Sequence, residues 1–138
     1  MKIIAIILSL ISFSVAAKIE RTTSCFLSDN NKMKLKYVEI YDNKTPLSYV
    51  KYSKSTSSIP LVFSKETEEE VEGGRPAERN TTWLEVVDGK INGKYEIMSQ
   101  GGRYYSFIYK GSNGKEVNFN EDVDAYNSEQ DDCIWKAI

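Results

Sequence analysis

The stretch YEIMSQGGRYYSFIYKG, residues 95–111, decides the fold of this chain. Apolar or aromatic residues alternate with other side chains on both sides of two adjacent glycines. A period of two is typical of β-strands, and the glycine pair indicates a turn between them. We therefore predict an antiparallel hairpin, in which the alternation places Tyr105, Phe107 and Tyr109 on the buried face.

The same pattern continues along most of the chain. β-branched and aromatic residues dominate the periodic segments, and turn signals such as Asp88-Gly89 and Asn92-Gly93 separate them. The sequence contains no internal repeat and no convincing amphipathic helix. About seven or eight short strands are expected, a number and spacing typical of an all-β antiparallel barrel or sandwich.

Acidic residues are concentrated in two stretches, although the formal net charge is only −2. Five glutamates lie between residues 66 and 72, within a loop-like acidic insertion at about residues 66–82. Six acids and no base lie between residues 121 and 132. Solvated faces explain such runs, and a surface that steers a basic partner is the alternative. The weak net charge does not indicate a nucleic-acid partner.

Residues 1–17 have the features of a secretory signal peptide. Lys2 precedes an apolar run that is too short for a membrane span, and Ala16 and Ala17 supply the small residues of a cleavage site. An anchor helix is the alternative, whereas a lipid anchor would need a cysteine directly after the small residues. We expect export to the periplasm or medium, with residues 18–138 as one domain without a membrane anchor.

The two cysteines lie near the ends of that domain. In an oxidising compartment Cys25 and Cys133 are expected to pair, and two free thiols are the less favoured alternative. The chain-entropy model gives a bond that closes such a long loop roughly 4.7 kcal/mol as an upper estimate. The predicted fold is therefore a small β-barrel closed by one disulfide.

The residue inventory argues against most enzyme classes. The chain has no histidine, which excludes nucleophile systems that use one and the common zinc sites, and it has no phosphate-binding loop. A glycosidase needs only two carboxylates, but the acids here cluster in charge runs. A Ser99–Lys110 nucleophile pair would need a desolvated lysine, and Lys110 is expected at an exposed strand end. We expect no catalysis, no metal and no cofactor.

The hairpin turn is instead a candidate binding surface. Gly101 and Gly102 allow a partner to approach the backbone closely, Arg103 is a forked donor, and Tyr104 offers rigid contact area. The alternative is that the glycines only form the turn and the tyrosines only fill the core.

Around these residues the sequence resembles a known protein family. Ser99 opens the segment SQGGRY, a strand ending at Lys110-Gly111 follows, and a short apolar strand with Val117 and Phe119 comes next. This order is similar to the signature of the periplasmic and membrane-bound inhibitors of C-type lysozymes. The resemblance implies an eight-stranded antiparallel barrel with one disulfide. It also implies that Ser99 and Lys110 engage the catalytic carboxylates of the enzyme.

The expected function is inhibition of a peptidoglycan-degrading enzyme, such as a lysozyme, by a protein that binds its active site. An immunity protein against a secreted cell-wall hydrolase is the first alternative. A small-ligand-binding barrel, with a pocket lined by Tyr95, Tyr105 or Phe107, is the second, and a structural or adhesive role is the third. The candidate partner-binding residues are Ser99, Gly101, Gly102, Arg103, Tyr104 and Lys110.

Overall fold

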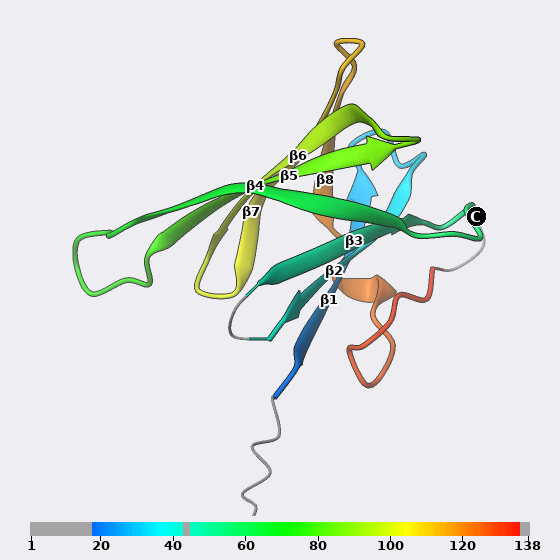
Figure 1. Ribbon diagram of the computed structural model, residues 1–138. Helices are drawn as coiled ribbons and strands as arrows, with labels where there is room; N and C mark the ends of the chain where they lie inside the picture. The colour runs from blue at the N-terminus through cyan, green and yellow to red at the C-terminus, as the bar shows by residue number, and fades with distance from the viewer. Residues whose placement is uncertain (1–17, 43–44, 136–138) are drawn as a thin grey trace, which may run out of the picture.

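The computed structural model describes residues 18–42 and 45–135, which form a closed antiparallel β-barrel of eight strands (Figure 1). Strand order in the barrel follows chain order, and a 3-10 turn, η1 (Val123–Ala125), follows β8. The all-β barrel prediction is confirmed, whereas the predicted signal peptide lies outside the described residues. The strands are β1 (Glu20–Ser28), β2 (Lys34–Tyr41), β3 (Pro46–Tyr52), β4 (Ile59–Glu69), β5 (Glu78–Val87), β6 (Lys90–Gln100), β7 (Arg103–Gly111) and β8 (Glu116–Glu121).

Aromatic side chains fill the middle of the barrel. The Phe107 ring contacts the rings of Phe26, Tyr37, Tyr95 and Phe119, with centroid distances between 4.3 and 6.0 Å. All five side chains are buried. An eight-stranded barrel has an interior just wide enough for side chains to fill, so this packing supplies most of the hydrophobic core.

A β-bulge changes which tyrosine of β7 enters the core. Ser99 pairs with Tyr104 while Met98 pairs with Ser106, which leaves Tyr105 without a partner on β6. Tyr104 therefore points inward and packs against the core, whereas Tyr105 is 57% exposed. The prediction that Tyr105 faces the core is wrong, because simple alternation does not include the extra residue.

The acidic stretch at residues 66–82 is a hairpin arm rather than a loop. Four residues of β4, 66–69, pair with residues 78–81 of β5, and only residues 70–77 connect the two strands. In this ladder Glu68 lies opposite Arg79 and Glu69 lies opposite Glu78. In the tail, an isolated antiparallel bridge joins Tyr126 to Cys133.

The barrel opens at one end, because two of its strand pairs are short. β4 pairs with β3 only through residues 59–61, and β8 pairs with β1 only through residues 119–121. Beyond these pairs, β1, β2 and β3 diverge from β4, β5, β6 and β7, as Figure 1 shows most clearly for β3 and β4. We call these two groups of strands the first leaf and the second leaf.

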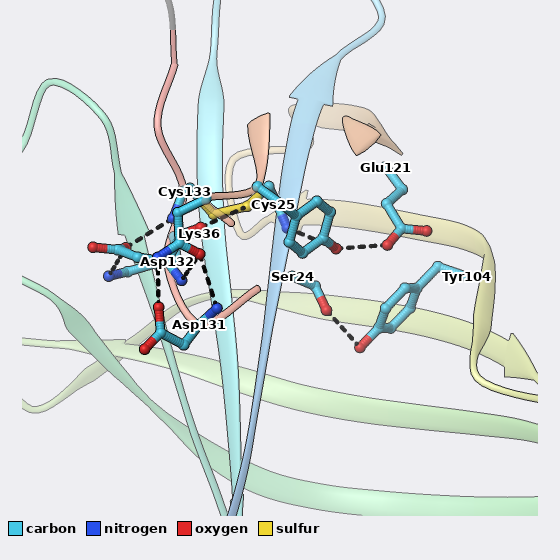
Figure 2. The surroundings of a disulfide bond; sticks show 10 residues. Ser24, Cys25, Lys36, Tyr104, Glu121, Asp131, Asp132 and Cys133 are labelled. Carbon is cyan, nitrogen blue, oxygen red and sulfur yellow. Dashed lines mark hydrogen bonds and ion pairs between the residues drawn. A yellow bond between two sulfur atoms is a disulfide. The ribbon is translucent and has the colours of Figure 1, made fainter. Parts of the chain in front are cut away.

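The predicted disulfide between Cys25 and Cys133 is present and fastens the chain after β8 onto β1 (Figure 2). The backbone N–H of Asp122 donates to the carbonyl of Cys25, and the Lys36 ammonium lies 2.8 Å from the carboxylate of Asp132. The tail, residues 122–135, is thereby held against the first leaf.

Candidate functional site

An open cleft of about 1250 Å³ separates the two leaves. The first leaf contributes residues 20–24 of β1 and the facing ends of β2 and β3, and the second leaf contributes β4, β5 and the turn between β6 and β7. Glu121 and the tail complete the lining. The cleft is therefore a consequence of the short β3–β4 and β8–β1 pairings.

A charged bridge crosses the cleft from one leaf to the other. The Arg79 guanidinium on β5 donates to Glu39 on β2 at 3.3 Å, and its Nε lies 3.9 Å from Glu66 on β4. The Thr81 hydroxyl donates to the same Glu66 carboxylate at 3.0 Å. Partial burial alone lowers the pKa of Arg79, but the two carboxylates raise it above its ordinary value. Arg79 thus stays charged and links the leaves.

Tyr104 forms part of the cleft wall rather than a free contact surface. Its phenol oxygen accepts a hydrogen bond from the Ser24 hydroxyl at 3.1 Å, as Figure 2 shows, and its ring packs edge-on against Phe26. Burial raises the pKa of Tyr104 to about 12. This residue therefore holds β7 against β1 where no backbone ladder joins the two strands.

The tail closes the same side of the cleft. Tyr126 donates to Glu121 at 2.6 Å, and its hydroxyl oxygen accepts from the backbone N–H of Cys25 at 3.3 Å. Partial burial, followed by the hydrogen bond to Glu121, raises the pKa of Tyr126 to about 12. The disulfide therefore positions one wall of the cleft.

Several polar atoms in and beneath the floor of the cleft have no hydrogen-bond partner among the described residues. Thr23 and Trp83 line the cleft, and the Thr23 hydroxyl and the Trp83 indole N–H are both unpartnered. Tyr37 and Ser48 are buried beside each other. Burial, together with the nearby charge of Glu39, raises the pKa of Tyr37 well above its ordinary value. The floor is thus polar as well as aromatic.

The charged lining of the cleft is predominantly acidic. Five carboxylates line it against two guanidinium groups, and the residues are Glu20, Glu39, Glu66, Glu68 and Glu121 with Arg21 and Arg79. Exposed apolar side chains also line it, namely Tyr41, Leu47, Phe63 and Val123. A cationic group carried on an apolar stem, as in lysine or arginine, matches this combination.

The structure separates the residues that the sequence grouped as partner-binding. Ser99, Gly101 and Gly102 line the cleft, and the exposed Arg103 follows them directly. Lys110 pairs with Lys94, which precedes Ser99 by five residues on β6. At about 3.4 Å per residue this places Ser99 and Lys110 roughly 17 Å apart, at opposite ends of the hairpin.

Lys110 belongs to a surface ion-pair group instead. Its ammonium lies 2.6 Å from Glu96, which also pairs with Lys94. The hydrogen bond to Glu96 raises the pKa of Lys110, and the two lysines lower the pKa of Glu96. Lys110 is therefore a charged surface lysine, and the Ser99–Lys110 nucleophile pair considered from the sequence does not form.

At the opposite end of the barrel a buried carboxylate closes the interior. Glu85 is only 4% exposed and accepts hydrogen bonds from Tyr95 at 2.8 Å and Tyr109 at 3.1 Å, with Asn92 as a further donor. Tyr52 meets the Tyr95 hydroxyl at 2.9 Å. Around Tyr95 and Phe107, where a ligand pocket was considered, side chains of the core fill the interior, and Tyr105 lies exposed outside it.

Sequence pattern alone did not indicate Glu39, Arg79 or Trp83 as cleft residues, whereas Glu66 belongs to the acidic stretch that was considered as a surface for a basic partner. One signal was available for Glu39, because it is an acid within the β-branched and aromatic run of residues 37–41. Arg79 had no comparable signal, because its role depends on two strands that are distant from it in sequence. The short strand pairs that bring these residues together are a property of tertiary register and not of local pattern.

Comparisons of the chain with protein-family models, with curated proteins and with solved structures found no match. Its function is therefore inferred from the geometry and chemistry of the cleft, together with the motif around Ser99.

Proposed function

We propose that this chain is an exported protein that inhibits a basic peptidoglycan-degrading enzyme by docking on it with the open end of the barrel. The observation that carries the proposal is the contact between the tips of two hairpins beside the cleft. Gln100 donates to the carbonyl of Pro76 at 2.9 Å, which joins the β6–β7 turn to the acidic β4–β5 arm. A Gly-Gly turn and a strongly acidic arm thus form one continuous rim.

The charge of the rim supports a basic protein as the partner. Residues 66–72 carry five glutamates, and the structure leaves residues 62–70 exposed. Acidic surfaces of this kind accelerate association with basic proteins and disfavour acidic ones. Because exposed charges are screened by salt, binding should weaken as ionic strength rises.

The turn is built to approach another molecule closely. Gly101 and Gly102 both have positive φ, at 58° and 78°, and a Cβ at Gly101 would lie 3.2 Å from the Pro76 ring. Both are exposed, so their backbone is available to a partner. The Ser99 hydroxyl at the base of the turn suits a hydrogen bond to a carboxylate of the enzyme.

The proposal assigns the docking role to the Ser99 end of the hairpin and not to Lys110. The two carboxyl groups of a retaining glycosidase lie only about 5–5.5 Å apart. Ser99 and Lys110, roughly 17 Å apart along the strand, do not reach one such pair together. Occupying the active site from the turn is sufficient, because it excludes the polysaccharide and the catalytic water.

The test is a turbidity assay in which a basic C-type lysozyme lyses bacterial cells in the presence of the purified mature chain. We expect lysis to slow, with a weaker effect at high salt. Ser99→Ala removes one hydrogen bond to a charged group and should weaken inhibition roughly tenfold to a hundredfold. Arg103→Ala should also weaken it.

Lys110→Ala is the informative control, because it changes a charged residue at the far end of the same hairpin. Inhibition should be unchanged in Lys110→Ala. If this variant instead loses inhibition, the docking surface lies at the Lys110 end of the hairpin and not at the Ser99 end. If a panel of lysozymes is unaffected at excess protein, the inhibitor proposal fails. A target other than lysozyme, as for an immunity protein, then becomes the better hypothesis, and a toxin encoded beside this chain would identify it.

A further inference from the structure

The outer half of β4 has a free edge. Residues 62–69 of β4 pair with β5 on one side, and within the described part of the chain no strand pairs with their other side. Pairing with β3 stops at Leu61, after which β3 and β4 diverge (Figure 1). Alternate N–H and C=O groups along this edge therefore point away from β5 without a strand partner.

The free edge borders the cleft. Phe63, Glu66 and Glu68 of β4 line the cleft. The register shift between Phe63 and Lys65 explains why Phe63 and Glu66 share a face although they are three residues apart. An extended segment laid along this edge would thus present one of its two faces to the cleft.

We infer that this edge takes an extended, lysine- or arginine-rich segment of the partner protein, which adds as a strand to β4. In strand addition the backbone hydrogen bonds supply affinity, and the alternate side chains supply specificity. Here the cleft-facing side chains of the added strand meet Glu66 and Glu68 on β4. They also meet the exposed apolar side chain of Leu47 on the opposite leaf.

Charge selects the kind of strand that can add. Residues 66–72 carry five glutamates, so two copies of this chain that paired through β4 would bring like charges together. The same charges favour a basic strand. The edge is thereby protected against self-association, which is the common hazard of an exposed edge, while it stays available to a basic partner.

This inference rests on the proposed protein-binding function, but its test uses isolated peptides and no enzyme. The probe is an eight-residue peptide that alternates lysine and threonine, with capped ends, titrated by calorimetry into the purified chain. The matched control replaces each lysine with glutamate. We expect binding of the lysine peptide only, together with slower amide hydrogen exchange at residues 62–69.

Two N-methylated isomers of the peptide distinguish strand addition from charge attraction. One isomer carries N-methyl groups on all lysines and the other carries them on all threonines, so each blocks the N–H groups along one edge of the peptide strand. If the peptide adds to β4, one isomer loses binding and the other retains most of it. Equal binding by both isomers, or protection outside β4, overturns the inference.

A pair of single variants locates the site. Glu68→Lys reverses a charge on the free edge and should weaken peptide binding about three- to tenfold. Glu116→Lys makes the same change on exposed β8, opposite Lys110, and should have little effect. No binding of the lysine peptide at millimolar concentration overturns the inference even if lysozyme is inhibited. If the lysine peptide binds but lysozyme is not inhibited, strand addition is supported and lysozyme is excluded as the target.

Discussion

Replacing Tyr95 with phenylalanine tests whether the Glu85 network closes one end of the barrel. The Tyr95 hydroxyl donates to the buried Glu85 carboxylate at 2.8 Å and meets the Tyr52 hydroxyl at 2.9 Å. Tyr95→Phe removes only the oxygen, so the ring still fills its place and no large cavity forms. The change therefore isolates the hydrogen bonds.

The expected loss follows from these two contacts. A hydrogen bond to a charged group contributes about 1.5–3 kcal/mol, and a neutral one contributes about 0.5–1.5 kcal/mol. Tyr109 and Asn92 still donate to Glu85 in the variant, so the carboxylate keeps part of its stabilisation. We expect the free energy of unfolding to fall by about 2–3 kcal/mol, which lowers Tm by roughly 10 °C in a domain of this size.

Denaturant unfolding followed by tryptophan fluorescence measures the change, because Trp83 is buried in the core. Tyr105→Phe is the matched control, since it removes the same atom from an exposed side chain and should change stability by less than about 0.5 kcal/mol. A double-mutant cycle with Glu85→Gln should show coupling between the two positions. If Tyr95→Phe is as mild as Tyr105→Phe, Glu85 does not hold the barrel end together.

Three further predictions concern the open end and the tail. Arg79→Met removes the bridge between the leaves and leaves Glu39 and Glu66 without their shared cation, so the free energy of unfolding should fall by about 1–2 kcal/mol. A smaller fall in Arg79→Lys, measured in parallel, would confirm that charge is the cause. Reduction of the disulfide, or a Cys25→Ala and Cys133→Ala double variant, should lower the free energy of unfolding by about 2–5 kcal/mol and speed amide hydrogen exchange in residues 122–135. Unchanged exchange in these residues would contradict the role of the disulfide in placing the tail. The folded state raises the pKa of three tyrosines, Tyr104, Tyr109 and Tyr126, from 10.0 to about 12, and so disfavours their ionised forms. The stability that this gives is fully present below pH 10 and should be lost as pH rises toward 12. Phenolate absorbance that titrates at pH 10 for every tyrosine in the folded protein would refute this prediction.

The sequence predicted the class of fold well, because local alternation and turn residues are enough to identify antiparallel strands. The disulfide was predictable because a chain with two cysteines has only one intramolecular pairing. Local alternation failed at Tyr105, where a bulge inserts an unpaired residue. It also failed at residues 66–82, where glutamates and threonines form strands because they pair across a hairpin, although their composition is typical of a loop.

The candidate site was predictable only in part, because the cleft results from strand pairs that end early and not from a local sequence motif. Ser99 and the two glycines mark the rim, yet the cleft exists because β3 pairs with β4, and β8 with β1, over only three residues each. The two ends of the barrel also differ in their polar groups. Glu85 and its phenol donors close one end with satisfied hydrogen bonds, whereas the open end holds unpartnered polar atoms, a free strand edge and the exposed glutamates of the β4–β5 arm. Substitutions in the Glu85 network should therefore change the free energy of unfolding, whereas substitution of an exposed acid at the open end, such as Glu68→Lys, should change partner affinity with little change in stability.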